Sequence, residues 1–278
     1  MAIVFRLKSF RKLVRSKVAL ALPVTFLILL VSTLGIIAVT YALSIGRISA
    51  QGENLKVSTA KQSFLSLDDV ILSTLWQPGS SETYDFPDSG GLMNVQPTSN
   101  LLTISINVNS GINQTIFNSI VGKLSYEILY TGSSETGLYL KGDGLTITNE
   151  SGSSPSQLFI TIGAQYPEIQ LRYRPQVSYA IGGLEDGKAV NNIRIYVINL
   201  NSSDPMTFQG HMPLKVSCTS TQLTTERLVG SQSGNFVITS QLDNDASGVS
   251  VPISSTSEGS IIYIETVISN VSIERRTL

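Results

Sequence analysis

An uncharged run of 29 residues, Val18–Gly46, constrains this chain more than any other feature of its sequence. About 20 apolar residues cross the hydrocarbon core of a bilayer at a rise of roughly 1.5 Å per residue, so the run is long enough even when tilted. Inside lipid every backbone N–H and C=O group must be paired, which requires a helix. The sequence therefore predicts a transmembrane helix over residues 18–46.

A cleaved secretory signal peptide is the alternative for such an N-terminal run. Signal peptides have apolar cores of about 7–15 residues, followed by a small-residue cleavage site. The run in this chain is about twice that length, which favours a retained helix.

Charged residues are distributed unevenly around the run. The formal net charge is −1, so no nucleic-acid partner is expected. Residues 1–17 carry six basic side chains and no acidic one, whereas Arg47 stands alone just after the run. Basic flanks remain on the cytoplasmic side of a membrane. We therefore expect a basic cytoplasmic leader at residues 1–17, an extracellular location beyond the span, and membrane lipid as a partner.

The helical pattern continues past the predicted span. Between Arg47 and Trp76, apolar residues recur at spacings of three, four or seven, which places them on one side of a helix: Ile48, Leu55, Ala60, Phe64, Leu67, Ile71 and Leu75. Polar residues occupy the other side, where Asp68-Asp69 is expected to be solvated. Pro78-Gly79 is a stop signal. The sequence predicts an amphipathic helical extension over residues 47–76.

Beyond Pro78 the pattern changes to the alternation typical of strands. Short segments rich in β-branched and aromatic residues are separated by turn sequences. The predicted strands are 101–108, 124–130, 157–162, 192–200, 214–219, 235–239 and 261–269. Residues 219–260, rich in Ser and Thr, are expected to contain long polar loops. The expected fold class is α+β: a long transmembrane-plus-amphipathic helix followed by an all-β, antiparallel, sandwich-like outer domain at residues 77–278. The pattern leaves open whether residues 77–278 form one domain or two.

Four Asn-x-Ser/Thr sequons lie on the predicted outer side, in or beside turns: Asn113, Asn149, Asn201 and Asn270. Such asparagines are candidate N-glycosylation sites in a host that carries out this modification. The chain is therefore a candidate glycoprotein.

A calcium loop is weighed against a polar turn at Asp243–Gly248. This segment has oxygen-bearing side chains at the first, third and fifth positions and glycine at the sixth. Ser254 stands where the bidentate Glu of such a loop belongs. A polar hairpin turn is the favoured interpretation, and no metal site is expected.

The chain lacks the residue sets on which most enzymes depend. His211 is the single histidine and Cys218 the single cysteine, so a histidine-rich zinc site and a thiolate pair are excluded. No G-x-S-x-G motif and no phosphate-binding glycine loop occurs in the sequence. Glu185-Asp186 is expected to form a turn, and Cys218 to be buried in a strand. We expect no catalytic residues and no cofactor.

The layout of the chain resembles the archaeal relatives of type IV pilins, including archaellins and pilin-like surface proteins. The resembling features are the basic leader RKLVRSK, Pro23-Val24 near the start of the apolar helix, the extension to Trp76 and a β-rich outer domain. Trp76–Val108 resembles the helix-to-hairpin entry of that family. The resemblance implies cleavage of the leader just before the apolar run, with Lys17 and Val18 as the candidate processing residues. It also implies helices packed in a filament core.

Two functions follow from these patterns. In the first, the chain is a pilin-like, membrane-anchored structural subunit of the cell surface that assembles with copies of itself or other pilin-like subunits through its helix. In the second, it is a permanently anchored single-pass surface binding or envelope protein that forms no filament. The mature N-terminus discriminates between them.

Overall fold

The computed structural model describes residues 17–108, 112–129, 136–152, 154–164, 166–230 and 234–276. Residues 1–16 of the expected leader lie outside this set. Contacts divide the chain into two compact units, residues 1–55 and residues 56–278. The second unit is β-rich and is called the β-rich unit below.

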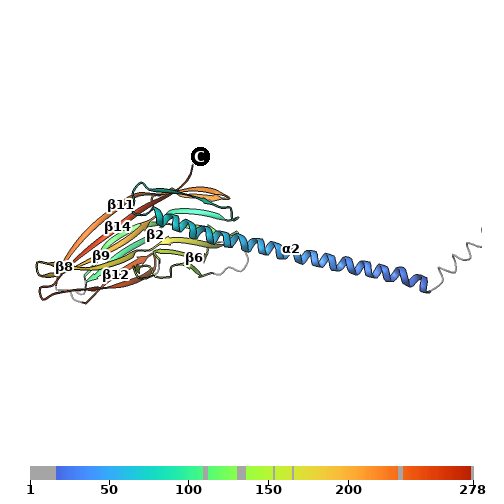
Figure 1. Ribbon diagram of the computed structural model, residues 1–278, viewed down its shortest axis with the longest axis horizontal. Coiled ribbons are helices and arrows are strands. Elements are labelled where there is room, and N and C mark those ends of the chain that lie inside the picture. The colour runs from blue at the N-terminus through green and yellow to red at the C-terminus, as the bar shows by residue number, and fades with distance from the viewer. Residues whose placement is uncertain are drawn as a thin grey trace, which may run out of the picture. The chain divides into compact units, whose positions relative to one another are not determined.

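One helix, α2 (Lys17–Thr74), contains both the predicted span and the predicted extension without a break (Figure 1). The predicted continuous helix is confirmed, and it ends two residues before Trp76. Trp76 has a positive φ of 66° and Gly79 a φ of 87°, which take the chain out of the helical conformation. The Ser80 hydroxyl donates to the Thr74 carbonyl at 2.7 Å and satisfies one carbonyl left open at the helix end.

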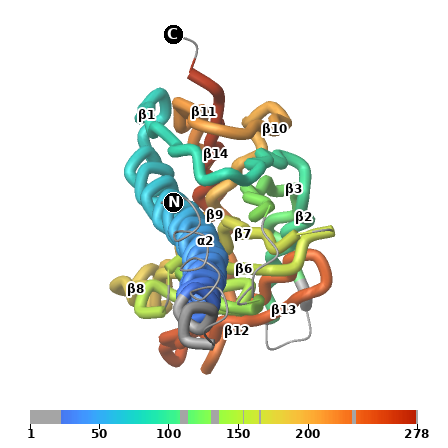
Figure 2. The backbone as a smooth tube through the Cα atoms, turned by 90° about the vertical axis from the view of Figure 1, so that its right-hand side faces the viewer, coloured from blue at the N-terminus to red at the C-terminus, as the bar shows by residue number. Residues whose placement is uncertain are grey.

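The strands of the β-rich unit form two sheets. The six-stranded sheet has the order β1 (Ser81–Phe86), β11 (Met212–Gly230), β14 (Ser260–Arg275), β9 (Lys188–Asn199), β8 (Gln176–Glu185) and β5 (Thr148–Asn149). The eight-stranded sheet has the order β13 (Asp245–Ile253), β12 (Gly234–Leu242), β2 (Leu92–Val108), β3 (Ile112–Glu127), β7 (Pro167–Tyr173), β6 (Ser156–Ile162) and β4 (Tyr139–Lys141), with β10 (Met206–Gln209) pairing β2. Figure 2 shows β11 beside β14 and β6 beside β7.

Each predicted strand overlaps an observed one, so the β-rich part of the prediction is confirmed. The strand predicted at 124–130 ends at Glu127, and residue 130 lies outside the described set. The expectation of long polar loops over 219–260 is wrong. Most of that segment belongs to β11, β12 and β13, and the side chains of 222–225 in β11 are exposed. Ser and Thr in a strand with two solvated faces give no apolar alternation, so the sequence pattern concealed these strands.

An antiparallel arrangement was expected, but two pairs of neighbouring strands are parallel. β14 runs parallel to β9, from Ser260 opposite Ala189 to Asn270 opposite Asn199, and β5 runs parallel to β8. Parallel neighbours need a crossover connection, and β10 to β13 supply it for β9 and β14. The expected helix-to-hairpin entry is also absent, because β1 and β2 belong to different sheets.

Apolar side chains of the two sheets gather in two clusters. One contains residues of β2, β3, β6, β7, β11 and β14 together with the buried face of α2. The other joins β2 and β12 of one sheet to β8, β9 and β14 of the other, with Ile104, Ile193 and Ile264 almost fully buried. Both clusters lie within the β-rich unit.

Candidate functional site: the helix and its anchorage

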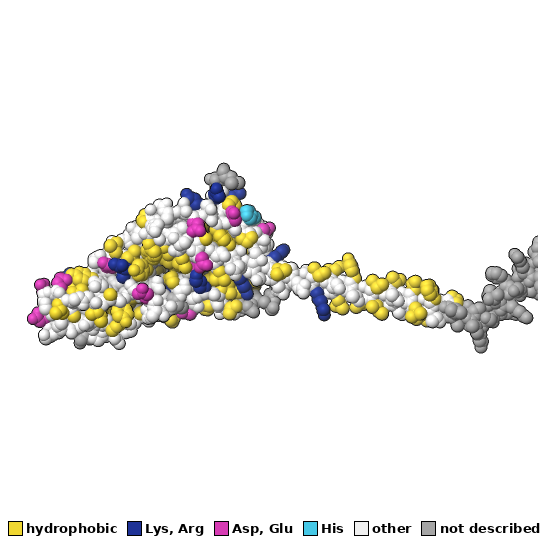
Figure 3. All heavy atoms as spheres, in the orientation of Figure 1, with side chains coloured by type: hydrophobic (Ala, Val, Ile, Leu, Met, Phe, Trp, Pro, Cys, Tyr) yellow, Lys and Arg dark blue, Asp and Glu magenta, His cyan; other side chains and the backbone are white. Residues whose placement is uncertain are grey.

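The first part of α2 presents apolar side chains on every side. From Pro23 to Gly52 each residue is exposed, and Phe26, Ile36 and Tyr41 are 68%, 67% and 68% exposed. Figure 3 shows these apolar side chains along the helix. By length and composition, α2 is the one helix among the described residues that is suited to cross a membrane. We call residues 23–52 the apolar half.

The second part of α2, residues 56–74, packs into the first apolar cluster of the β-rich unit, and we call it the docked half. Phe64, Leu67 and Ile71 are fully buried there. The Phe64 ring meets the Phe86 ring edge-on, with centroids 5.6 Å apart, an arrangement favourable for aromatic pairs. The predicted stripe is therefore a packing face from Ala60 onward. Its first two members, Ile48 and Leu55, are exposed instead.

A buried carboxylate ties the docked half to the strands. The Asp68 side chain is inaccessible to solvent and accepts hydrogen bonds from Ser156 Oγ and Tyr173 OH, both at 2.7 Å. It also accepts from Lys141 Nζ at 2.5 Å, which compensates its charge. A buried charge is tolerated where it is paired and its oxygens are hydrogen-bonded, and all of these donors come from β4, β6 and β7. We call this group the Asp68 anchor.

The expectation that Asp68-Asp69 is a solvated pair is wrong for Asp68 and fits Asp69. The Asp69 side chain is 73% exposed and contacts Lys141 Nζ at 3.1 Å. Ala60, Phe64 and Asp68 follow one another at intervals of four, so all three lie on the buried face. That spacing was a readable signal for the burial of Asp68.

The anchor shifts the pKa of two of its donors upward. Burial alone would lower the pKa of Lys141, but its hydrogen bonds and charge interactions with Asp68 and Asp69 outweigh burial and raise it above 10.5. Burial raises the pKa of Tyr173 well above 10.0, and the negative charge of Asp68 adds to this effect. Both groups therefore keep their protons at neutral pH.

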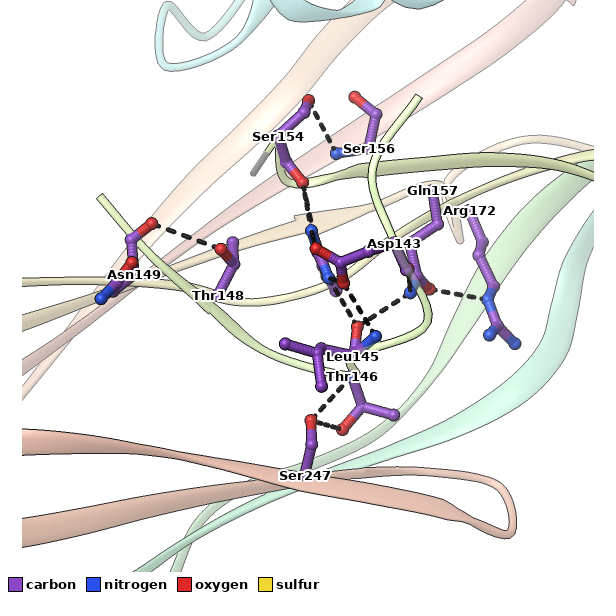
Figure 4. A network of polar contacts seen from close by, with 11 residues as sticks. Asp143, Leu145, Thr146, Thr148, Asn149, Ser154, Ser156, Gln157, Arg172 and Ser247 are labelled. Carbon is purple, nitrogen blue, oxygen red and sulfur yellow. Dashed lines mark hydrogen bonds and ion pairs between the residues drawn. The ribbon is translucent and has the colours of Figure 1, made fainter. Parts of the chain in front are cut away.

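A second polar network surrounds Arg174, whose side chain is fully buried. Figure 4 shows Asp143, Leu145, Ser154 and Gln157 of this network. Its guanidinium pairs with the Asp143 carboxylate and donates to the carbonyl oxygens of Leu145 at 2.8 Å and Ser154 at 3.0 Å. The Gln157 amide donates to the carbonyls of Asp143 and Leu145 at 2.7 and 2.8 Å. These bonds fix the irregular segment between β4 and β6 against the strands.

This network has the chemistry of a structural brace. The Arg174 guanidinium is paired with one carboxylate and with backbone carbonyl acceptors, which hold segments of the chain together. Beside it, Arg172 donates to Gln157 Oε1 at 2.8 Å and lies 5.1 Å from the centre of the Phe159 ring. Burial lowers the pKa of Arg172 below its usual range, and charge interactions with Tyr139, Asp245 and Asp243 oppose this.

His211 and Cys218, the single histidine and the single cysteine, lie in different surroundings. His211 is exposed in the turn between β10 and β11, and Cys218 is 1% exposed within β11, which confirms its predicted burial. Within the described ranges no group of three or more His, Cys, Asp or Glu side chains is placed to hold a metal ion.

Each of the two segments expected to be a turn contains part of one and continues into a strand: residues 245–248 belong to β13, and Glu185 is the last residue of β8. Leu242 pairs with Asp245 across a two-residue hairpin turn, in which Asp243 has a φ of 54° and its carboxylate accepts from Leu101 N at 2.9 Å. Asp186 and Gly187 both have positive φ in the hairpin between β8 and β9, which is typical of a type I′ turn.

The candidate modification sites are dispersed. Lys17 and Val18 begin α2, but their side chains and that of Asn113 lie outside the described set. Asn149 is half-buried at the end of β5, and Asn201 is exposed in the turn after β9. Asn270 lies within β14 instead of beside a turn, so that expectation is wrong for it. Asn201 and Asn270 line the same cleft.

Comparison of the chain with protein-family models, curated proteins and solved structures gave no match.

Proposed function

We propose that this protein is a pilin-like structural subunit of the cell surface, anchored in the cell membrane by the apolar half of α2. The main support is a contrast along one helix. Residues 23–52 are exposed on every side, whereas residues 56–74 pack into the core of the β-rich unit. Burying a large apolar side chain gains about 1.5–3 kcal/mol. A run of such side chains needs an environment outside its own chain, either lipid or neighbouring helices.

The Asp68 anchor supports a mechanical role for the helix. A subunit that assembles through the apolar half must transmit force from that half to its outer domain. The docked half provides this connection through the Phe64 and Leu67 packing face and the hydrogen bonds of Asp68. The two clusters that join both sheets are consistent with a sandwich-like outer domain that resists such force.

The proposed topology places the basic N-terminus in the cytoplasm and the β-rich unit outside the cell. Its support is the excess of basic residues before the run and the lone Arg47 after it. Protease added to intact cells is expected to digest the β-rich unit and to spare the segment before the span. Digestion that requires permeabilised cells would reverse the orientation.

The mature N-terminus tests assembly. Six basic side chains are costly to bury without partners in a filament core, so an assembling subunit must lose them. Mass spectrometry of protein from its native membrane is expected to find a new N-terminus between Lys17 and Ala21, and electron microscopy of the sheared surface fraction is expected to find filaments. An N-terminus at Met1 or Ala2 would instead support the second function, a permanently anchored surface binding or envelope protein.

The role is structural and the protein is not an enzyme in this proposal. The buried charged groups of the described chain, Asp68 and Arg174, are engaged in holding segments together. No cofactor is required by any part of the proposal.

A further inference from the structure

A cleft of about 360 Å³ lies where strands of both sheets meet in the β-rich unit. Its walls come from β3 of the eight-stranded sheet and from β9, β11 and β14 of the six-stranded sheet, with the turn after β9 at its rim. The volume is at the lower end of the range for small-molecule sites, about 300–1,000 Å³.

The lining of this cleft is polar but carries no charge. Six of its side chains bear amide or hydroxyl groups: Ser119, Asn199, Asn201, Ser202, Gln222 and Asn270. No Lys, Arg, Asp or Glu is found among the described lining residues. Recognition of a phosphate or carboxylate depends on cationic donors, and recognition of a cation on carboxylates. Amides offer both donors and acceptors, which suits a neutral ligand rich in hydroxyl groups.

Phe117 and Ile268 add a small apolar surface to the mostly polar cleft. An aromatic ring next to amides provides a face for the C–H side of a sugar ring, while the amides pair with the hydroxyl groups at its edge. This combination distinguishes a saccharide from a small polar solute such as urea, which has no apolar face.

Asn199 supplies a donor that the protein itself leaves unused. The residue is 2% exposed, and its Oδ1 accepts from the backbone N of Asn201 at 3.1 Å. Within the described part of the chain its Nδ2 has no hydrogen-bond partner. The Nδ2 atom is not among the buried side-chain atoms that lack a partner, so it is open to the cleft, where a ligand oxygen can replace solvent as its acceptor.

The walls of the cleft are held before any ligand arrives. A β-bulge in β11 at Thr219 turns its hydroxyl toward the rim, 3.1 Å from Ser202 Oγ and 3.0 Å from the Asn270 carbonyl. Close by, a Cβ on Gly122 of β3 would lie 2.8 Å from the Leu200 carbonyl oxygen, so the two sheets approach backbone to backbone. A preformed cleft lowers the entropic cost of binding.

We propose that this cleft binds a short neutral saccharide, with Asn199 Nδ2 donating to a sugar oxygen and Phe117 contacting a sugar ring. The saccharide has two sources. One is an outside glycan, and the other is a glycan attached to the protein at Asn201 or Asn270, both of which line the cleft. This site is independent of whether the helices assemble.

The first arm of the test uses the full chain in detergent micelles, produced in a host that does not N-glycosylate. Maltotriose and chitotriose are offered, and binding is measured by saturation-transfer NMR and titration. The expected result is binding of at least one of them, weakened about fivefold or more in Asn199→Asp, which keeps Oδ1 but removes the donor. The matched control is Asn107→Asp, an exposed position on β2, which leaves binding unchanged. Fluorescence of Trp76, the single tryptophan, verifies that both variants are folded.

The second arm uses glycosylated protein from the native membrane. Glycopeptide mass spectrometry identifies any glycan at Asn201 or Asn270, and NMR contacts between that glycan and the Phe117 ring identify the attached source. Binding in the first arm assigns the outside source instead. The proposal is overturned if neither trisaccharide binds and no attached glycan contacts Phe117, or if Asn199→Asp binds both trisaccharides as tightly as the unmodified chain.

Discussion

The two halves of α2 contain similar apolar residues, but these side chains are buried in the docked half and exposed in the apolar half. Phe26 in the apolar half is 68% exposed, whereas Phe64 in the docked half is fully buried. In the docked half, apolar residues occupy one face and Lys56, Lys61 and Asp69 the others, so the core of the same chain is sufficient to cover them. In the apolar half, residues 23–46 carry no charge on any face, so these side chains are expected to be covered from outside the chain. The distribution of polar residues around a helix, more than its apolar content, reveals which environment it needs.

The largest expected effect separates the two halves directly. Phe64→Ala leaves a cavity in the cluster shared by α2 and both sheets, and is expected to cost about 3–5 kcal/mol of unfolding free energy. Phe26→Ala, in the same helix, is expected to leave the stability of the β-rich unit unchanged. Denaturant titration of the full chain in micelles, followed by Trp76 fluorescence, measures both. Trp76 suits this purpose because its ring centroid lies 5.2 Å from that of Tyr196. Equal losses in the two variants would contradict the division of the helix.

The second effect concerns the environment of the apolar half. Ile37→Arg places a charge in the middle of the predicted span and is expected to cost about 2.5–3.5 kcal/mol of insertion free energy. The expected result is a smaller membrane-bound fraction after carbonate extraction, with unchanged Trp76 fluorescence. Ile37→Val is the matched control. Full membrane retention of the arginine variant would argue that protein, and not lipid, surrounds this segment.

The third effect tests the Asp68 anchor. Asp68→Asn removes the negative charge to which three side chains donate, and is expected to lower the free energy of unfolding by about 2–3 kcal/mol. The loss is smaller than for a fully buried ion pair, because the Lys141 side chain is 26% exposed. Asp69→Asn, at an exposed neighbour, is expected to change stability by less than about 0.5 kcal/mol. Both are measured by the same denaturant titration. If the two variants lose the same amount, the anchor does not hold the docked half.

The smallest effect appears at alkaline pH. The pKa values of Lys141 and Tyr173 are raised in the folded state, so the folded chain holds protons that the unfolded chain releases. Their contribution is fully present below about pH 10, where the unfolded groups titrate, and is lost as the pH rises further. Tyr173→Phe is expected to cost about 1 kcal/mol at pH 8 and to flatten the decline between pH 10 and 12.

The matched control for that measurement is Tyr179→Phe, since Tyr179 is 49% exposed on β8. Its stability profile between pH 8 and 12 is expected to follow that of the unmodified chain. A Tyr173→Phe profile as steep as that of the unmodified chain would mean that other groups cause the alkaline loss.

Local patterns in the sequence were sufficient to predict the helix and the apolar strands. The spacing of Ala60, Phe64 and Leu67 identified a helical face, and the alternation in 192–200 identified β9, because both signals come from neighbouring residues. The point at which the helix stops being covered, near Leu55, was not predicted, since it depends on how far the sheets reach along α2.

Pairings between distant segments escaped prediction for a related reason. The parallel alignment of β14 with β9 depends on contacts between residues about 70 positions apart, for which a single sequence carries no local signal. The cleft was missed as well: its lining comes from four strands and one turn, and Asn199, the residue that most suggests a ligand, belongs to no motif. Asp68 was misread although its spacing was visible, because charged residues are rarely buried.

The place of β14 in the first apolar cluster also affects the order in which a newly made chain buries its apolar residues. The apolar half of α2 leaves the ribosome before the docked half, which follows with its apolar face uncovered. The cluster that buries Phe64 includes Val271 and Ile273 of β14, the strand synthesised last among those described. The packing face of the docked half therefore stays incompletely covered until β14 has been translated. The apolar half is exposed to its surroundings before the β-rich unit closes around the docked half.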